Sequence, residues 1–114
     1  MTDSETSVKL WELDSTHPEK AETLRTALRE VLDPELGLSV IELGLIRDVS
    51  MRQDKLHVQM ILTTPYCPYG PALLEMTRSR AEQVLTVPTK IEIGREYWEP
   101  SMMEDGATAD WGLL

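Results

Sequence analysis

The feature that most constrains this fold is an alternating segment that ends in a proline-rich turn. In residues 55–63, apolar and polar side chains alternate, which predicts a β-strand with one buried face. The alternation stops at residues 63–68, Thr-Thr-Pro-Tyr-Cys-Pro, and apolar residues then recur at helical spacing from about Pro71 to Leu85. The chain must therefore pass from a strand to a helix through a turn whose backbone two prolines restrict.

Three other periodic segments complete the domain. Helical spacing after Thr16 predicts a first helix that ends at Asp33, because the next residue is proline. Residues 45–52 predict a strand that forms a hairpin with the alternating segment, and Lys90–Ile93 predicts a short third strand parallel to it. This order predicts an α+β fold, with a small mixed sheet of three or slightly more strands and two helices packed on one face.

The charge distribution divides the chain into a near-neutral centre and two acidic ends. The 114 residues suffice for one domain, and the net charge of −9 arises mainly at the ends. We therefore expect an acidic N-terminal segment over residues 1–16, an α+β domain over residues 17–97 and an acidic, tryptophan-containing tail over residues 98–114. Nucleic acid is not an expected partner, because phosphate binding needs clustered lysine and arginine. Without a secretory signal or a membrane-length apolar run, a cytoplasmic protein with no membrane partner is expected.

Cys67 is the only cysteine and the strongest candidate for chemistry. It lies in the proline-rich turn just before a predicted helix N-terminus, whose partial positive charge favours the thiolate. One thiolate cannot hold a zinc ion or an iron–sulfur cluster alone, because these sites usually take four ligands. The alternative is that Cys67 is a small buried hydrophobic side chain with a structural role only.

Two acidic and two hydroxyl side chains are candidate neighbours of the cysteine. Asp33 and Glu35 flank a proline in a loop, and together with the thiol they would form a mixed oxygen-and-sulfur group for a metal or a partner. The alternative is that the two acids only form the turn that ends the first helix. Thr63 and Thr64 precede the cysteine turn, where their hydroxyls can donate to a thiolate or cap the turn.

All three tryptophans lie in the end segments, at Trp11, Trp98 and Trp111. One interpretation is that the ends fold back and use these rings as anchors on the core. The other is that Trp98 and Trp111 belong to a tail that binds a partner, since tryptophan is enriched at interface hot spots.

Four segments together resemble a known family. They are Asp33–Leu36, Val40–Ile46, Leu62–Pro68 and Trp98–Pro100. They are similar to the metal–sulfur cluster assembly factors, which include SufT-like and PaaD-like proteins and the cytosolic iron–sulfur targeting subunit of eukaryotes. The resemblance covers roughly residues 18–100. It implies a small α+β fold, a non-enzymatic role in maturing iron–sulfur proteins, a functional cysteine at Cys67 and an acidic loop at Asp33 and Glu35.

These observations lead to one main expectation and several alternatives. We expect an accessory or targeting factor for iron–sulfur cluster assembly, in which Cys67 contacts a cluster or its iron transiently as a shared ligand. No tightly bound cofactor is expected. The expected partners are the assembly machinery and client apoproteins, and a homodimer is one way to supply further ligands. The alternatives are a protein-binding adaptor with a structural cysteine, a small cysteine-dependent enzyme, which lacks an evident histidine base near the turn, and a phenylacetate-degradation accessory protein. The resemblance disfavours the last, because family members with that role tend to have a cysteine-rich C-terminal extension and no cysteine follows Cys67 here.

Overall fold

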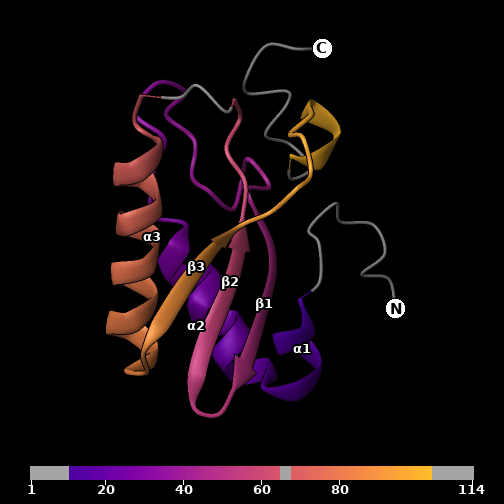
Figure 1. The fold of residues 1–114 in the computed structure, drawn as a ribbon, viewed down its shortest axis with the longest axis vertical. Helices are drawn as coiled ribbons and strands as arrows, with labels where there is room; N and C mark the ends of the chain where they lie inside the picture. The colour runs from indigo at the N-terminus through magenta and orange to yellow at the C-terminus, as the bar shows by residue number, and fades with distance from the viewer. Residues whose placement is uncertain (1–10, 65–67, 104–114) are drawn as a thin grey trace.

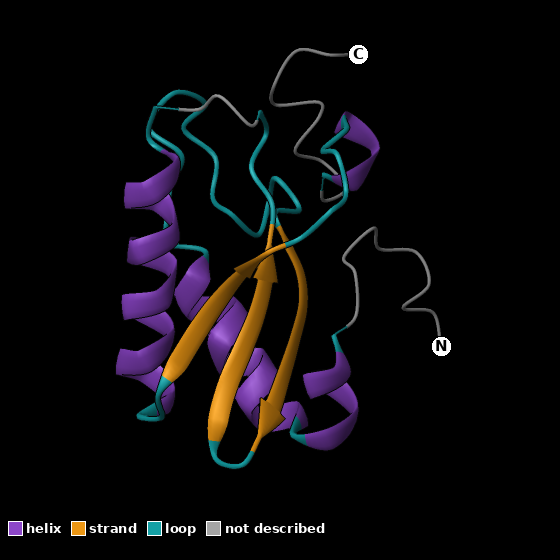
Figure 2. Ribbon diagram, viewed as in Figure 1, coloured by secondary structure: helices purple, strands orange, loops and turns teal. Residues whose placement is uncertain are grey.

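The computed structural model of the protein describes residues 11–64 and 68–103. Within these ranges, helices pack against a three-stranded mixed sheet (Figures 1 and 2), which confirms the predicted α+β class. No helix of the described ranges is long and apolar enough to cross a membrane. The elements in chain order are α1 (Glu12–Thr16), α2 (Pro18–Leu28), β1 (Ile46–Arg52), β2 (Lys55–Met60), α3 (Gly70–Leu85), β3 (Thr89–Ile93) and the short 3-10 helix η2 (Pro100–Met102).

The sheet has the order β1–β2–β3 and combines one antiparallel with one parallel pair. β1 and β2 form the predicted hairpin, and its turn residues Gln53 and Asp54 have φ angles of 55° and 63°, as a type I′ turn requires. β2 and β3 are parallel, because α3 carries the chain back to the end of the sheet where β2 begins. The carboxyl ends of the two parallel strands therefore lie at the same end of the sheet.

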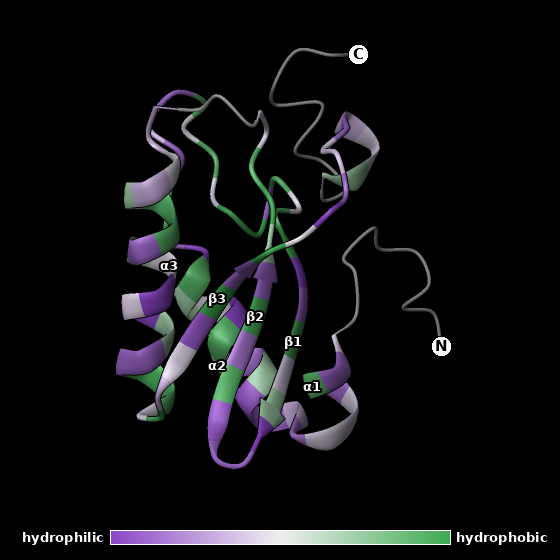
Figure 3. Cartoon of the chain, in the orientation of Figure 1, coloured by the Kyte–Doolittle hydropathy of each residue, from purple (hydrophilic) through white to green (hydrophobic). Residues whose placement is uncertain are grey.

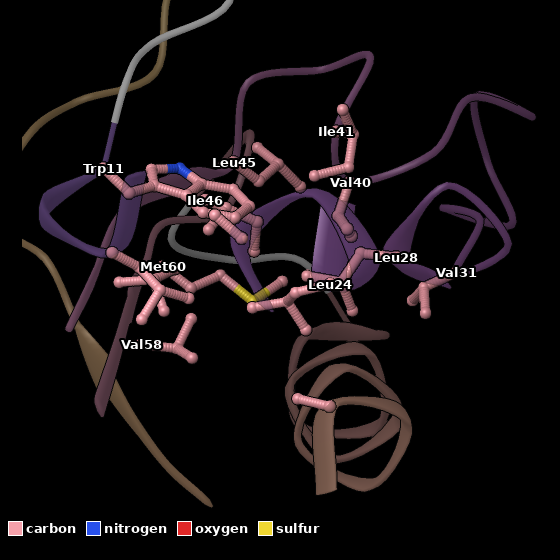
Figure 4. Close-up of a cluster of buried hydrophobic side chains, with 14 of the residues drawn as sticks. Trp11, Leu24, Leu28, Val31, Val40, Ile41, Leu45, Ile46, Val58 and Met60 are labelled. Carbon is pink, nitrogen blue, oxygen red and sulfur yellow. The ribbon is translucent and has the colours of Figure 1, made fainter. Parts of the chain in front are cut away.

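The hydrophobic core lies between the sheet and the helices (Figure 4). On β2, Leu56, Val58 and Met60 are fully buried, while the residues between them are more exposed. Figure 3 shows this alternation as successive apolar and polar bands along the strand. Leu24 and Leu28 of α2 are fully buried in the same cluster. The alternation predicted from the sequence is confirmed, and it leaves the opposite face of the sheet polar.

The first long helix is shorter than the sequence predicts. α2 ends at Leu28, five residues before Asp33. Beyond it, Leu32 pairs with Ser39 in an isolated antiparallel bridge, and the Val40 N–H donates to the Val31 carbonyl. These long-range backbone bonds replace the helical ones, which explains why proline was not the residue that ended the helix.

The helix α1, which the sequence did not predict, is fastened to α2 by an aromatic and ionic cluster. The Arg25 guanidinium lies 4.1 Å from the centroid of the Trp11 ring and forms two hydrogen bonds with the Asp14 carboxylate, at 2.9 and 3.2 Å. Burial raises the pKa of Asp14, but the hydrogen bonds from Arg25 and the Trp11 N–H and the charge of Arg25 outweigh it. The pKa of Asp14 therefore lies below its usual value.

A single helical turn between the bridge and β1 is closed at both ends by local hydrogen bonds. At its start, the Ser39 N–H donates to the Glu42 carboxylate and the Glu42 N–H donates to the Ser39 hydroxyl, which is a capping box. At its end, Gly44 has a φ of +74°, and the Leu45 N–H donates to the Val40 carbonyl, as in a Schellman motif. We call residues 39–45 the capped turn.

The segment after β3 docks on the capped turn. The Trp98 indole N–H donates to the Leu43 carbonyl at 2.6 Å, and Arg47 bridges the Gly44 carbonyl and the Glu96 carboxylate. A Cβ atom on Gly44 would lie only 2.0 Å from the Met102 carbonyl oxygen. Two features therefore require glycine at position 44: its left-handed backbone conformation and the close approach of Met102.

The substitution Gly44→Ala should displace the docked segment, and Gly37→Ala is its matched control. Gly37 has a similar φ of +72°, but a Cβ atom added to it would meet no other atom within 4 Å. We expect Gly37→Ala to lower the free energy of unfolding by about 1 kcal/mol, and Gly44→Ala to lower it by roughly 2–4 kcal/mol because overpacking is added. Denaturant titration gives the energies. The indole N–H resonance of Trp98 should move in the Gly44 variant alone, and equal effects of the two variants would contradict the docking contact.

The substitution Asp14→Asn should weaken the fold at neutral pH. Asparagine can still accept the Trp11 backbone N–H but leaves the nearly buried Arg25 guanidinium with only the exposed Glu22 carboxylate, 3.8 Å away, as a charge partner. We therefore expect a loss of roughly 1–2 kcal/mol. Because folding lowers the pKa of Asp14, its contribution is present above about pH 4 and is lost as the pH falls through the folded-state value. Thermal unfolding between pH 2 and pH 7 checks this, with Glu22→Gln as the control. A pH dependence unchanged by Asp14→Asn would refute the assignment.

Candidate functional site

The parallel strands β2 and β3 lead into connections that diverge at their carboxyl ends. After β2 the chain turns toward the start of α3, whereas after β3 it crosses to η2 on the opposite side (Figure 1). Where the connections of two neighbouring parallel strands leave in opposite directions, a crevice opens at the carboxyl ends of the strands. Such a crevice is a frequent location of binding sites. Here the crevice is a groove of about 490 Å³, which we call the strand-end groove, lined by residues 61–63 and 93–98.

The two walls of the strand-end groove differ in exposure. Ile61 on the β2 side is buried, at 2% exposed, and belongs to the core. On the β3 side, Ile93 is 60% and Tyr97 85% exposed, and both are among the most exposed large hydrophobic side chains of the described residues. Trp98 is held in place by its bond to the Leu43 carbonyl. The groove therefore joins a buried apolar floor to a rim whose apolar side chains face solvent.

The two ends of the cysteine turn are fixed by contact with each other. Thr63 and Thr64 are half-buried at the end of the β2 side, and α3 begins at Gly70 with a proline in its first turn. A Cβ atom on Gly70 would lie 2.7 Å from a terminal methyl carbon of Leu62, so glycine permits the helix start to pack against the strand end. Cys67 itself lies outside the described residues, as do Pro65 and Tyr66.

The acidic loop is built around the side chain of Asp33. Asp33 is 2% exposed, and one of its carboxylate oxygens accepts hydrogen bonds from the Glu35 and Leu36 N–H groups, at 2.8 and 3.2 Å. This geometry accounts for Asp33 as a turn-forming residue. Glu35, in contrast, is exposed. The loop of residues 33–38 lies at the same end of the long axis of the molecule as the start of α3 (Figure 1).

The structure brings some of the predicted site residues together. Thr63 and Trp98 line the same groove. The grouping of Cys67 with Asp33 and Glu35 remains a prediction, and Trp111 also lies outside the described residues. Trp98 is an anchor on the core by its hydrogen bond, while its role as a partner contact remains a prediction. Ile93 and Tyr97 were not predicted as site residues, because their exposure on one groove depends on the directions in which the connections after β2 and β3 leave the sheet.

The described residues offer no separate metal centre. No group of three or more histidine, aspartate or glutamate side chains within residues 11–64 and 68–103 could hold a metal ion. His57 lies near the start of β2, at the far end of the strand from the groove, and His17 lies between α1 and α2. Metal chemistry would therefore draw on Cys67, on other residues outside these ranges or on ligands from another molecule.

Comparison with known proteins identifies the family. The sequence model of the iron–sulfur cluster assembly protein family matches residues 21–93. The Fe–S protein maturation auxiliary factor YitW of Bacillus subtilis is 36% identical over 86 residues, covering 74% of this chain and 81% of that protein. An Fe–S protein maturation auxiliary factor of Porphyromonas gingivalis is 38% identical over 90 residues, covering 76% and 86%. In fold, the crystal structure of a domain of unknown function, DUF59, from Bacillus anthracis matches with a TM-score of 0.78 at 20% identity, over 88% of this chain and 98% of that one. The resemblance found in the sequence is confirmed, and this chain belongs to the iron–sulfur cluster assembly protein family.

Proposed function

We propose that this protein is a non-enzymatic accessory factor in the maturation of iron–sulfur proteins, and that Cys67 supplies one shared ligand to a cluster or its iron during transfer. The observation that carries this proposal is the position of the two ends of the cysteine turn. Thr63, before the turn, lines the strand-end groove, and Gly70, after it, begins α3 against Leu62. Two relatives named as maturation auxiliary factors support the same role.

Chain connectivity alone keeps the thiol near the groove. Cys67 follows Thr63 by four residues and precedes Gly70 by three. A fully extended chain covers at most about 3.6 Å per residue, so the Cα atom of Cys67 is within roughly 14 Å of that of Thr63 and 11 Å of that of Gly70. A partner that enters the strand-end groove would therefore come within reach of the sulfur.

The ligand count makes the cargo a shared one. An iron–sulfur cluster usually takes four thiolate ligands, and this chain has a single cysteine. The other ligands must then come from a scaffold, a client apoprotein or a second copy. Incomplete coordination suits transfer, because a cluster held by one thiolate of this protein can exchange to a client that offers more. Thr63 and Thr64 would donate hydrogen bonds to the thiolate, and the exposed Glu35 carboxylate is a candidate contact for iron.

A second candidate is an adaptor that recruits a client without contacting its cargo. Its specific support is the exposed apolar rim of Ile93 and Tyr97, which suits protein contact better than ion binding. In that case Cys67 is structural, and Trp98 and Trp111 belong to the binding tail. A cysteine-dependent enzyme is disfavoured, because both histidines lie far from the cysteine turn along the fold. We place the protein in the cytoplasm, with the assembly machinery and client apoproteins as partners.

Replacement of Cys67 by serine tests the transfer role. We expect Cys67→Ser to keep the melting temperature but to reduce the activity of iron–sulfur enzymes at least about tenfold in cells that depend on this protein, since one ligand is lost. The activities of those enzymes and of an iron-independent enzyme are measured together. The test requires cells in which deletion of the protein abolishes the activity of the iron–sulfur enzymes. Full enzyme activity with Cys67→Ser in those cells would exclude Cys67 as a cluster ligand and favour the adaptor function.

Two substitutions of Asp33 separate its charge from its role in the loop. Asparagine can still accept the two backbone N–H groups through its carbonyl oxygen, whereas alanine cannot. If the carboxylate contacts iron, both Asp33→Asn and Asp33→Ala should lose maturation activity. If Asp33 only forms the turn, Asp33→Asn should stay active and Asp33→Ala should lose about 1–3 kcal/mol of stability. Denaturant unfolding and the same enzyme activities distinguish these results, and a fully active Asp33→Asn would remove the charge from the proposed site.

A further inference from the structure

We propose that the outer edge of β3, with the face of α3 beside it, binds one extended acidic segment of a partner protein as an added β-strand. This inference goes beyond the proposed function, because none of its residues is a candidate contact for the cluster. It rests on the direction of the backbone groups of β3, on the groove between β3 and α3, and on the charges around that groove.

The backbone groups of β3 alternate between β2 and the outer edge. The Leu56 N–H donates to the Pro88 carbonyl at one end of the strand, and the Gly94 N–H donates to the Met60 carbonyl at the other, at 2.8 and 2.9 Å. The even-numbered positions therefore face β2, and Ile91 and Ile93 direct their N–H and carbonyl groups away from it. Within the described part of the chain, no strand pairs with this edge.

The two outer strands of the sheet, β1 and β3, differ in what covers their outer edges. Along β1, the Glu12 N–H of α1 donates to the Asp48 carboxylate, and Glu12 also pairs with Arg52, so α1 covers part of this edge. Along β3, only the first outward N–H, that of Thr89, has a partner among the described residues, and it is the Glu82 carboxylate of α3 at 3.1 Å. The carboxylate takes the place that a strand carbonyl would occupy, and the next two positions remain open for a strand.

A groove runs along the open edge. Its volume is about 620 Å³, and its lining includes Leu74 and Arg78 of α3 and Thr89 to Ile91 of β3. Ile91 is paired in register with the fully buried Val58, so its side chain points to the helix side, where Leu74 also lies. A strand added to β3 would place every second side chain on this apolar floor, and α3 would flank it.

The charges around the groove favour an acidic segment. Its lining holds three basic and two acidic side chains on a protein whose net charge is −9. Both acids, Glu75 and Glu82, are already held by Arg78. Among the described residues Lys55 forms no ion pair, and Lys90 forms only a long one, 3.7 Å to Glu92, with 60% of its side chain exposed. A carboxylate opposite Lys90 on the added strand would find an available cation.

A blocked heptapeptide, Ac-Ser-Thr-Val-Asp-Val-Thr-Ser-NH2, is the probe, because its two valines share one face of an extended strand and its central aspartate lies on the other face, as Lys90 does relative to Ile91. We expect it to slow the exchange of the Ile91 and Ile93 amide hydrogens about tenfold at saturation, with chemical-shift changes confined to β3 and the facing side of α3. The same peptide with N-methylated backbone should cause neither effect. Cys67→Ser should bind the probe as the parent does, so the inference and the proposed function can fail separately.

Two variants make the test specific. Ile93→Pro removes an outward N–H without touching the bonds to β2 and should weaken the probe about tenfold, whereas Ile93→Val should bind normally. Lys90→Glu, at an exposed position, should reverse the preference in favour of a peptide with lysine in place of the aspartate. The proposal is overturned by three results: no binding at millimolar probe, equal binding to Ile93→Pro, or protection of Ile91 and Ile93 that depends only on protein concentration. The last would assign the edge to a second copy of the chain.

Discussion

The parallel pairing of β2 with β3 is the constraint on which the other features depend. Because α3 returns the chain to the starting end of the sheet, both strands have their carboxyl ends at the same end of the sheet. The connections after them separate there. One connection carries the only cysteine, and the other follows the exposed Ile93 and carries the exposed Tyr97. An antiparallel arrangement would have placed these two connections at opposite ends of the molecule. The candidate site is therefore a consequence of the crossover.

The capped turn of residues 39–45 converts that divergence into a groove with a fixed wall. It presents the Leu43 carbonyl to the Trp98 indole and the bare Cα of Gly44 to Met102. With the Arg47–Glu96 ion pair and the buried Met103 side chain, these two contacts hold the segment that follows the edge strand β3. All of the capped turn except Ser39 lies in the Val40–Ile46 segment that carries the family resemblance, and the structure gives this segment a physical role in holding the groove wall.

Periodicity predicted the local elements of this fold well. The hairpin, α3 and β3 were predictable because each depends on alternation, helical spacing or a tight turn within a short stretch of sequence. The predicted end of α2 was wrong, because the chain after Leu28 is held by residues farther along the sequence. These contacts are the bridge between Leu32 and Ser39 and the hydrogen bond from the Val40 N–H to the Val31 carbonyl. α1 was missed for a similar reason, since the partner that stabilises it, Arg25, lies on the next helix. The requirement for glycine at position 44 depends on Met102, which no local pattern reveals.

The candidate site was predictable only in part. Thr63 and Trp98 are brought to one groove, and Asp33 has a backbone role that fully occupies one of its oxygens. The exposed rim residues Ile93 and Tyr97 could not be found from sequence, because their place on the groove depends on the divergent connections after β2 and β3. In the proposed site, the lone thiol of Cys67 lies on a short connection whose flanking residue Thr63 lines the strand-end groove, and another molecule supplies the remaining ligands.

The most direct test of this view is the iron and sulfide content of the pure protein after anaerobic reconstitution, measured with and without glutathione as a source of further thiolates. We expect no stable cluster on the chain alone, and cluster absorbance with bound iron only when glutathione is present, because one cysteine leaves most of the coordination sites empty. A stable cluster on the chain without added thiol, or no iron uptake under either condition, would contradict the shared-ligand role of Cys67.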